Sequence, residues 1–212
     1  MIQQHRPRLF VHVEEPSMDI ALTKLLPGVL GDRGCEFKII DHGSKAALLK
    51  DLPARLQGYA ARRSEDIRVL VLVDRDNDDC RTLKVKLERV AHSAGLATKT
   101  APGVDGQFRV VNRIVIEELE AWFLGDVPAL GKAYPGVPLG LASKAPFRDP
   151  DAVVGGTWEA LGRVLKSAGH YTRSDNLPKI EVARRVVEHM APAANRSRSF
   201  QVFVSGLEAL LA

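Results

Sequence analysis

Residues 67–79, IRVLVLVDRDNDD, combine an almost continuous apolar run with an abrupt change to acidic side chains. Only Arg68 interrupts the run of Ile, Val and Leu. Such a run is typical of a strand buried on both faces, as in a parallel sheet covered by helices. Sheets of this class bind ligands just beyond the carboxyl ends of their strands. The stretch therefore predicts a central strand that delivers Asp74 and Asp76 to a functional site, on the same side if the backbone stays extended.

The first 125 residues alternate between expected strands and helices. Further strands are expected at 8–13, 37–40 and 108–116, and helices from Ser17 to Pro27, from Ser44 onward, over 79–93 and after 116. Pro53 is expected to kink or break the second helix. The alternation indicates an α/β fold, Rossmann-like, with a mostly parallel sheet and helices on both faces.

The pattern changes after Trp122. Residues 134–150 contain four prolines and predict a long irregular stretch. Helical segments are expected at 151–168, 177–190 and 197–211. We therefore divide the chain into an α/β core, residues 1–125, and a helical C-terminal extension, residues 126–212, packed on the core as one structural unit.

Composition excludes several classes of protein. No apolar run approaches the ~20 residues of a membrane-spanning helix, and the N-terminus lacks the apolar segment of a signal peptide. Two cysteines form neither a disulfide framework nor a zinc pattern, which predicts a cytoplasmic location. The net charge of +4 is compatible with a nucleic-acid partner without demanding one. Motifs of serine hydrolases, P-loop proteins and dinucleotide-binding proteins are absent from the sequence.

Acidic residues follow three of the expected strands. The three sets are Glu14 and Glu15, Asp74 and Asp76, and Glu117, Glu118 and Glu120. Two carboxylates about 4 Å apart repel by about 4 kcal/mol at an effective dielectric near 20, so a cluster must protonate, bind a cation or spread apart. Without His or Cys at matching spacing, the expected cation is Mg²⁺ or Mn²⁺, which points to phosphoryl chemistry.

A purely structural interpretation accounts for the same residues. Asp78 or Asp79 can cap the helix that follows the central strand, and the other acids are then loop residues. Glu117 and Glu118 can complement the dipole at the start of a helix. In a helix, Glu118 and Glu120 lie about 200° apart, whereas in an extended strand they point together.

A glutamate after the first strand and D-x-D after a later buried strand resemble the Toprim domain of topoisomerases, primases and OLD-type nucleases. The resemblance implies that Glu14, Asp74 and Asp76 bind Mg²⁺ for cleavage or transfer of phosphodiesters. This chain departs from the family at one position, because Glu15 stands where glycine usually follows the glutamate. The choice between Glu14 and Glu15 is therefore open.

A closer resemblance covers nearly the whole chain. The motifs V-E-E-P-S-M-D, V-L-V-D-R-D, I-E-E-L-E-A-W-F-L-G-D and R-S-R-S-F resemble the domain-of-unknown-function family 4276, a Toprim-related bacterial group. The resemblance implies a Toprim-like fold and metal-dependent nuclease activity, with a role in defence against phage. It favours Glu118 and Glu120 as the two acids of the third set, and of these we choose Glu118 first and Glu120 second.

The leading hypothesis is a Mg²⁺- or Mn²⁺-dependent nuclease acting on DNA or RNA, with Glu14, Asp74, Asp76 and Glu118 as catalytic metal ligands and Glu120 as a further ligand. The candidate substrate-binding residues, in or near the irregular stretch, are Lys144, Arg173 and Lys179. Among the histidines, His42 is the best candidate because it follows a strand. The alternative is a non-catalytic sensor or subunit that works with a partner ATPase.

Overall fold

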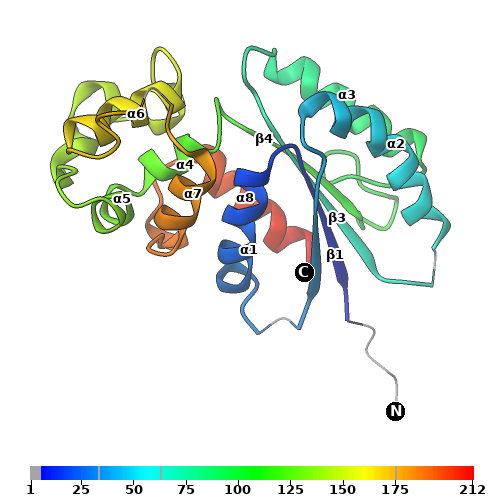
Figure 1. The fold of residues 1–212 in the computed structure, drawn as a ribbon. Coiled ribbons are helices and arrows are strands. Elements are labelled where there is room, and N and C mark those ends of the chain that lie inside the picture. The colour runs from blue at the N-terminus through cyan, green and yellow to red at the C-terminus, as the bar shows by residue number, and fades with distance from the viewer. Residues whose placement is uncertain (1–5, 33, 63, 175) are drawn as a thin grey trace.

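The structure, a computed structural model, describes residues 6–32, 34–62, 64–174 and 176–212 (Figure 1). The strands are β1 (Arg8–Val13), β2 (Glu36–Asp41), β3 (Ile67–Asp74) and β4 (Val110–Val115). The helices of the core are α1 (Pro16–Leu30), α2 (Lys45–Ala61) and α3 (Cys80–Ser93). The C-terminal helices are α4 (Glu120–Gly125), α5 (Val127–Ala133), α6 (Thr157–Ser167), α7 (Lys179–Val187) and α8 (Arg198–Leu210).

The four strands form one parallel sheet in the order β2-β1-β3-β4. In this register Val13 lies beside Asp41, and Asp74 lies beside Val115, so the carboxyl ends of all strands meet at one edge. The chain passes from β1 to β2 on one side and then to β3 on the other side. The strand order therefore reverses between β1 and β3, the point where open α/β sheets bind ligands. The α/β fold with a parallel sheet is confirmed.

Two apolar cores cover the two faces of the sheet. Alternate residues of β1 and β3 point to opposite faces, as a pleated strand requires. Leu9 and Val11 belong to the core under α1 and α8, whereas Phe10 and Val69 belong to the core under α2 and α3. Figure 1 shows these two pairs of helices on opposite sides of the sheet.

Two prolines lie inside helices without ending them. Pro53 is an interior residue of α2, and α1 continues past Pro27, where the sequence predicted its end, to Leu30. An interior proline costs a helix about 3 kcal/mol. In α2 the neighbouring Leu52 and Leu56 are fully buried, and each contributes about 1.5–3 kcal/mol. Packing on the sheet thus offsets the local cost of Pro53.

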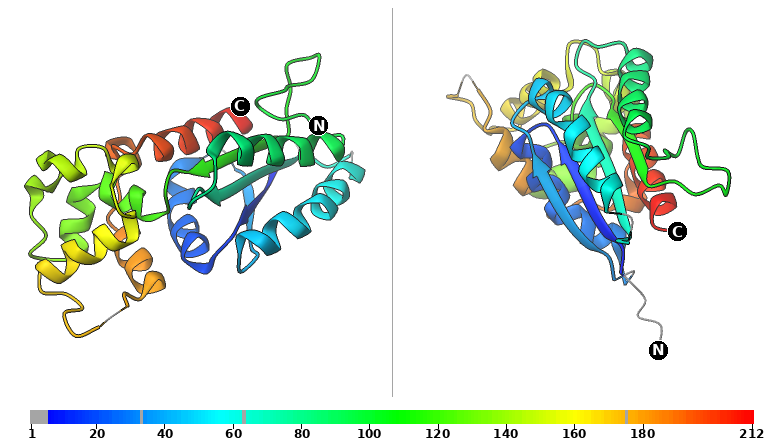
Figure 2. Two further views of the ribbon diagram at one scale, coloured as in Figure 1. Left: turned by 90° about the horizontal axis from the view of Figure 1, so that it is seen from above. Right: turned by 90° about the vertical axis from the view of Figure 1, so that its right-hand side faces the viewer.

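The C-terminal half forms a lobe beside the sheet and then returns to it (Figure 2). The irregular stretch contains three short 3-10 helices, Leu139–Ser143, Ala145–Phe147 and Pro150–Ala152, and a fourth follows α7 at Pro192–Ala194. Helix α7 packs against α1, and α8 packs against β4. One apolar core runs from β1 through α4 to α8. No helix in the described part of the chain is long and apolar enough to cross a membrane.

Candidate functional site

Glu14 and Asp74 lie at the carboxyl ends of the two central strands. Glu14 directly follows β1, and Asp74 is the last residue of β3. The backbone N–H of Asp74 donates a hydrogen bond of 2.8 Å to Glu14 Oε1. Both side chains are buried, with exposed fractions of 7% and 3%. The strand reversal thus brings together two acids that are 60 residues apart in the sequence.

Glu120 supplies a third buried carboxylate from the first turn of α4, and only 1% of it is exposed. Glu14 Oε2, Asp74 Oδ1 and Glu120 Oε2 have no hydrogen-bond partner within the described residues. A buried carboxylate oxygen without a donor is unfavourable, because its hydration has been lost and nothing replaces it. The described residues therefore supply no hydrogen-bond donor to these three carboxylate oxygens, which leaves them available to a ligand.

Burial makes the charged form of these acids unfavourable. It raises the pKa of Glu14 to about 7 against the opposing effects of the Asp74 backbone N–H and Lys45. Burial also raises the pKa of Glu120 to about 7, although Lys179 acts in the opposite direction. The pKa of Asp74 is raised well above its ordinary value by burial and then by the charges of Glu14 and Glu120. Asp74 is therefore linked electrostatically to both Glu14 and Glu120, and we call these three carboxylates the acidic cluster.

Asp76 lies at the rim of the site and not beside Asp74. The strand ends at Asp74, and Asp76 has a left-handed backbone with φ of 48°. The backbone is therefore not extended at Asp76, and the condition on which the prediction for the two aspartates rested is not met. The half-exposed Asp76 carboxylate lies 2.6 Å from Lys45 Nζ, which is also 2.9 Å from Asp78. Asp79, not Asp78, caps α3 by accepting a hydrogen bond from the Thr82 N–H.

The three glutamates after β4 have different surroundings. Glu117, with a left-handed φ of 56°, pairs with Arg75. Glu118 Oε2 accepts hydrogen bonds from Thr157 Oγ1 at 3.2 Å and from the N–H of Trp158 at 3.1 Å, at the start of α6. Glu120 is the member of this set that is fully buried with an unpartnered oxygen. The helix begins at Glu120, so neither a continuous strand nor a continuous helix describes all three residues.

Lys179, the first residue of α7, brings a positive charge from the C-terminal extension to the acids. Its Nζ lies 3.8 Å from Glu15 and 3.8 Å from Glu118, and 5.1 Å from the centre of the Trp158 ring. Burial acts to lower the pKa of Lys179, but Glu120, Glu15 and Glu118 together raise it. Lys179 is therefore held as a cation over the acidic cluster.

The other two candidate substrate-binding residues form no such ion pair within the described residues. Lys144 and Arg173 are exposed, and neither forms an ion pair with an acid in the described parts of the chain. Glu15 is also less central than Glu14, because it is partly exposed and accepts a hydrogen bond from Ser17. Of the two glutamates after β1, Glu14 is the one with a buried, unpartnered oxygen.

Lys45 was missed by the sequence reasoning. It is the first residue of α2, directly after the Asp41-His42-Gly43-Ser44 turn that leaves β2. Because β2 neighbours β1, its carboxyl end also opens on the site. The position of Lys45 after an expected strand was the available signal, in the same way as for the acids.

The donor chemistry of the cluster fits a hard cation such as Mg²⁺ or Mn²⁺, since free carboxylate oxygens are the ligands these ions prefer. Within the described ranges, however, no three His, Cys, Asp or Glu side chains are grouped closely enough to hold a metal ion. The residues Glu14, Asp74 and Glu120 thus fit the ion in type and burial, and they would have to draw closer together to bind it.

The model of the domain of unknown function DUF4276 matches residues 13–208. The chain belongs to the DUF4276 family. The match includes all strand-end acids, Lys45, Lys179 and the C-terminal motif. No match was found among curated proteins or among solved structures.

The two most distinctive motifs of this DUF4276 chain meet each other at the base of α8. In R-S-R-S-F, Ser199 Oγ accepts a hydrogen bond of 3.0 Å from Trp122 Nε1 of the E-A-W block. Asp151 accepts from the hydroxyls of Ser197 and Ser199 at 2.8 and 2.9 Å. Ser197 also caps α8. These polar residues anchor α8 on α4, so packing accounts for their pattern.

His42 belongs to a buried hydrogen-bond chain on the α2 side of the sheet. His12 Nδ1 lies 2.9 Å from His42 Nε2, and His12 Nε2 lies 3.1 Å from the Tyr59 hydroxyl. His42 Nδ1 lies 3.5 Å from the Asp51 carboxylate. Burial, followed by the charges of His42 and Arg55, lowers the pKa of His12 to about 3. His12 is therefore neutral, and the chain of contacts fixes β2 and α2 to β1.

Proposed function

We propose that this DUF4276 protein is a metal-dependent phosphotransfer enzyme, a nuclease that hydrolyses phosphodiester bonds of DNA or RNA. The observation that carries the proposal is the set of buried carboxylate oxygens of Glu14, Asp74 and Glu120, which lack hydrogen-bond partners in the described chain. Glu14 follows β1 and Asp74 ends β3, so these two lie at the strand reversal, where sheets of this kind bind substrates, and Glu120 follows β4, the neighbour of β3. The Toprim resemblance of Glu14 and the D-x-D pair supports the same assignment.

Electrostatics argues that the cluster needs a cation. Three linked carboxylates in a buried setting favour protonation, as their raised pKa values indicate. A divalent ion would remove this cost by compensating their charge. In the proposal Glu14, Asp74 and Glu120 would hold the ion, with Asp76 and Glu118 at the rim as further ligands. When bound, Mg²⁺ or Mn²⁺ would supply an activated water and stabilise negative charge on the phosphate.

Two lysines would position the substrate in this proposal. Lys45 Nζ bonds to Asp76 and Asp78 on one side, and Lys179 Nζ lies near Glu15 and Glu118 on the other. A metal ion at the acids would compete for these carboxylates and leave the lysine side chains available to phosphate oxygens. Fixed positive charges in a partly buried site stabilise a phosphoryl group more strongly than they would in water.

The test uses purified protein with plasmid DNA, single-stranded DNA and RNA, each with Mg²⁺ or Mn²⁺. We expect metal-dependent cleavage that Asp74→Asn reduces by about a hundredfold or more, a loss of about 3 kcal/mol of transition-state stabilisation. Glu208→Gln is the matched control, because Glu208 is exposed on α8. Absence of cleavage by the wild type with either metal, or equal cleavage by Asp74→Asn, would contradict the proposal.

A second candidate function is a non-catalytic sensor or subunit that works with a partner ATPase. The ion pairs of Lys45 and Lys179 with the acids favour it, because they already compensate part of the cluster's charge. This candidate predicts a folded protein that does not bind Mg²⁺ or Mn²⁺ at the concentrations of these ions found in cells. Metal titration therefore separates the two functions.

A further inference from the structure

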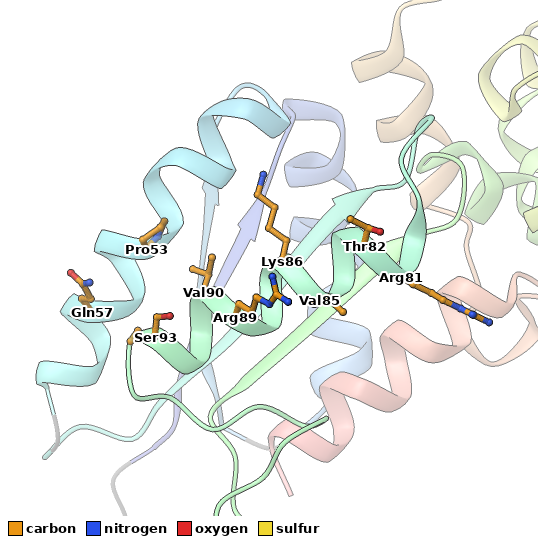
Figure 3. A pocket seen from close by; sticks show the side chains of 10 residues that line it. Pro53, Gln57, Arg81, Thr82, Val85, Lys86, Arg89, Val90 and Ser93 are labelled. Carbon is orange, nitrogen blue, oxygen red and sulfur yellow. The ribbon is translucent and has the colours of Figure 1, made fainter.

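A groove of about 800 Å³ runs along the outer surface between α2 and α3. Figure 3 shows side chains of α3 beside Pro53 and Gln57 of α2 along this groove. None of its lining residues belongs to the acidic cluster. The groove is therefore a separate feature, and a ligand could bind there whether or not the acidic cluster has the proposed function.

The groove has apolar side chains exposed to solvent. Val85 of α3 is 47% exposed, which is high for a large apolar side chain. Val90 and Pro53 line the groove beside it and are partly exposed. Val85, Val90 and Pro53 thus give the groove a small apolar floor that is available to the apolar side chains of another molecule.

Three cations border the same groove, and none of the described residues that line it is a carboxylate. Arg81, Lys86 and Arg89 are exposed residues of α3. None of the three forms an ion pair with an acid in the described part of the chain. Lys84, one turn away on the inner side of α3, does pair with Glu88 at 2.6 Å. The outer stripe of α3 thus presents positive charge beside the apolar floor, from Lys86 and Arg89 without an ion-pair partner in the described residues and from Arg81 near the carboxylate of Asp79.

We propose that this groove binds an acidic amphipathic helix of a partner protein. The lining residues of α3 and its C-cap span residues 81–94, about 20 Å at 1.5 Å per residue, which matches a helix of three to four turns. The apolar face of such a helix would cover Val85 and Val90, and its acidic edge would face the three cations. This pairing satisfies the apolar and the charged parts of the groove together.

The same observations disfavour two other occupants. A nucleic-acid backbone would use the cations but leave the apolar floor without a matching surface, since its contacts are mostly to phosphates and sugars. A second copy packed around a two-fold axis would set the cations of one groove against those of the other, which costs free energy.

The test measures binding of a fluorescent peptide of about 14 residues, designed as an amphipathic helix with leucines on one face and glutamates along its edge. A scrambled peptide of the same composition is the matched ligand control. We expect saturable binding of the designed peptide to the full-length protein, and amide signals of α3 should shift in NMR spectra. The double variant Arg81→Glu/Arg89→Glu should weaken binding at least about tenfold, whereas Lys132→Glu on α5 should not.

Three outcomes would overturn the proposal. The first is no saturable binding of the peptide up to about 1 mM, the weakest affinity of interest for such a contact. The second is equal binding of the scrambled peptide or of the double variant, with thermal melting showing that the variant is folded. The third is binding of single-stranded DNA, but not of the peptide, in a manner that the double variant abolishes. This last result would assign the groove to nucleic acid.

Discussion

Replacing Glu120 by glutamine should remove a pH-dependent cost that the acidic cluster places on the fold. Glu120 is fully buried at the start of α4, and burial, opposed by Lys179, raises its pKa from 4.5 to about 7. A folded-state pKa above the unfolded value means that the native state holds this proton more tightly. The resulting stability is fully present below pH 4.5 and is lost as the pH rises through about 7.

The magnitude follows from the two pKa values. The difference between 4.5 and about 7 corresponds to about 3 kcal/mol in the free energy of unfolding. Glutamine has the same shape and does not titrate. Relative to the wild type, Glu120→Gln should therefore gain about 3 kcal/mol between about pH 4.5 and about pH 8.

The assay is urea unfolding at these two pH values in the presence of a chelator, followed by circular dichroism. Glu208→Gln serves as the control and should show the same pH dependence as the wild type, because Glu208 is exposed. A stability difference between Glu120→Gln and the wild type that does not change with pH would refute the idea that burial penalises the charged form of this carboxylate.

Three other sets of contacts lead to further predictions. Burial lowers the pKa of His12 to about 3, so His12 stays neutral in the native state while the unfolded chain takes up a proton below about pH 6.5. As the pH falls from 6.5 to about 4.5, the free energy of unfolding should therefore decrease by about 1 kcal/mol per pH unit because of this residue. Urea unfolding of His12→Gln should lack this decrease. Ser199→Ala should lower the free energy of unfolding by about 2 kcal/mol, measured by thermal melting, because it removes contacts with Asp151 and Trp122. Asp76→Asn should change stability by less than about 1 kcal/mol in the same melting assay, because its pair with Lys45 is half-exposed on the aspartate side.

The sequence predicted the strands of the sheet because each has a strong local signal. The apolar run of residues 67–73 and the acids that follow it correspond to β3 and its carboxyl end. The positions of Glu14 and Asp74 at one edge follow from parallel pairing alone. This part of the site depends only on which strands exist and in which direction they run.

The arrangement beyond the strand ends was not predictable in the same way. Asp76 does not continue strand β3 because its backbone is left-handed, and no residue pattern in the sequence predicts this turn. Glu118 and Glu120 separate because α4 begins only at Glu120. Their partners, Trp158 and Lys179, come from the C-terminal extension, about 40 to 60 residues later in the sequence. These contacts depend on packing between segments far apart in the sequence, which the hydrophobic periodicity of each segment does not predict.

The residues of the family motifs fall into two groups, those at the candidate site and those that pack α8. The acid of E-A-W and the D-x-D aspartates lie at the site, whereas Ser197, Ser199 and Trp122 hold α8 in place. Distinctive residue patterns therefore accompanied both the candidate site and the packing of α8, and only the contacts distinguished the two.

The most direct test of the central claim is calorimetric titration of Mn²⁺ and Mg²⁺ into the purified protein at about pH 8. If Glu14, Asp74 and Glu120 form a cation site, the wild type and Glu208→Gln should bind the metal saturably and release protons on binding, because the raised pKa values leave these carboxyls partly protonated. Asp74→Asn should lose the binding while remaining folded. A folded wild-type protein that shows no saturable binding of either metal would contradict the account.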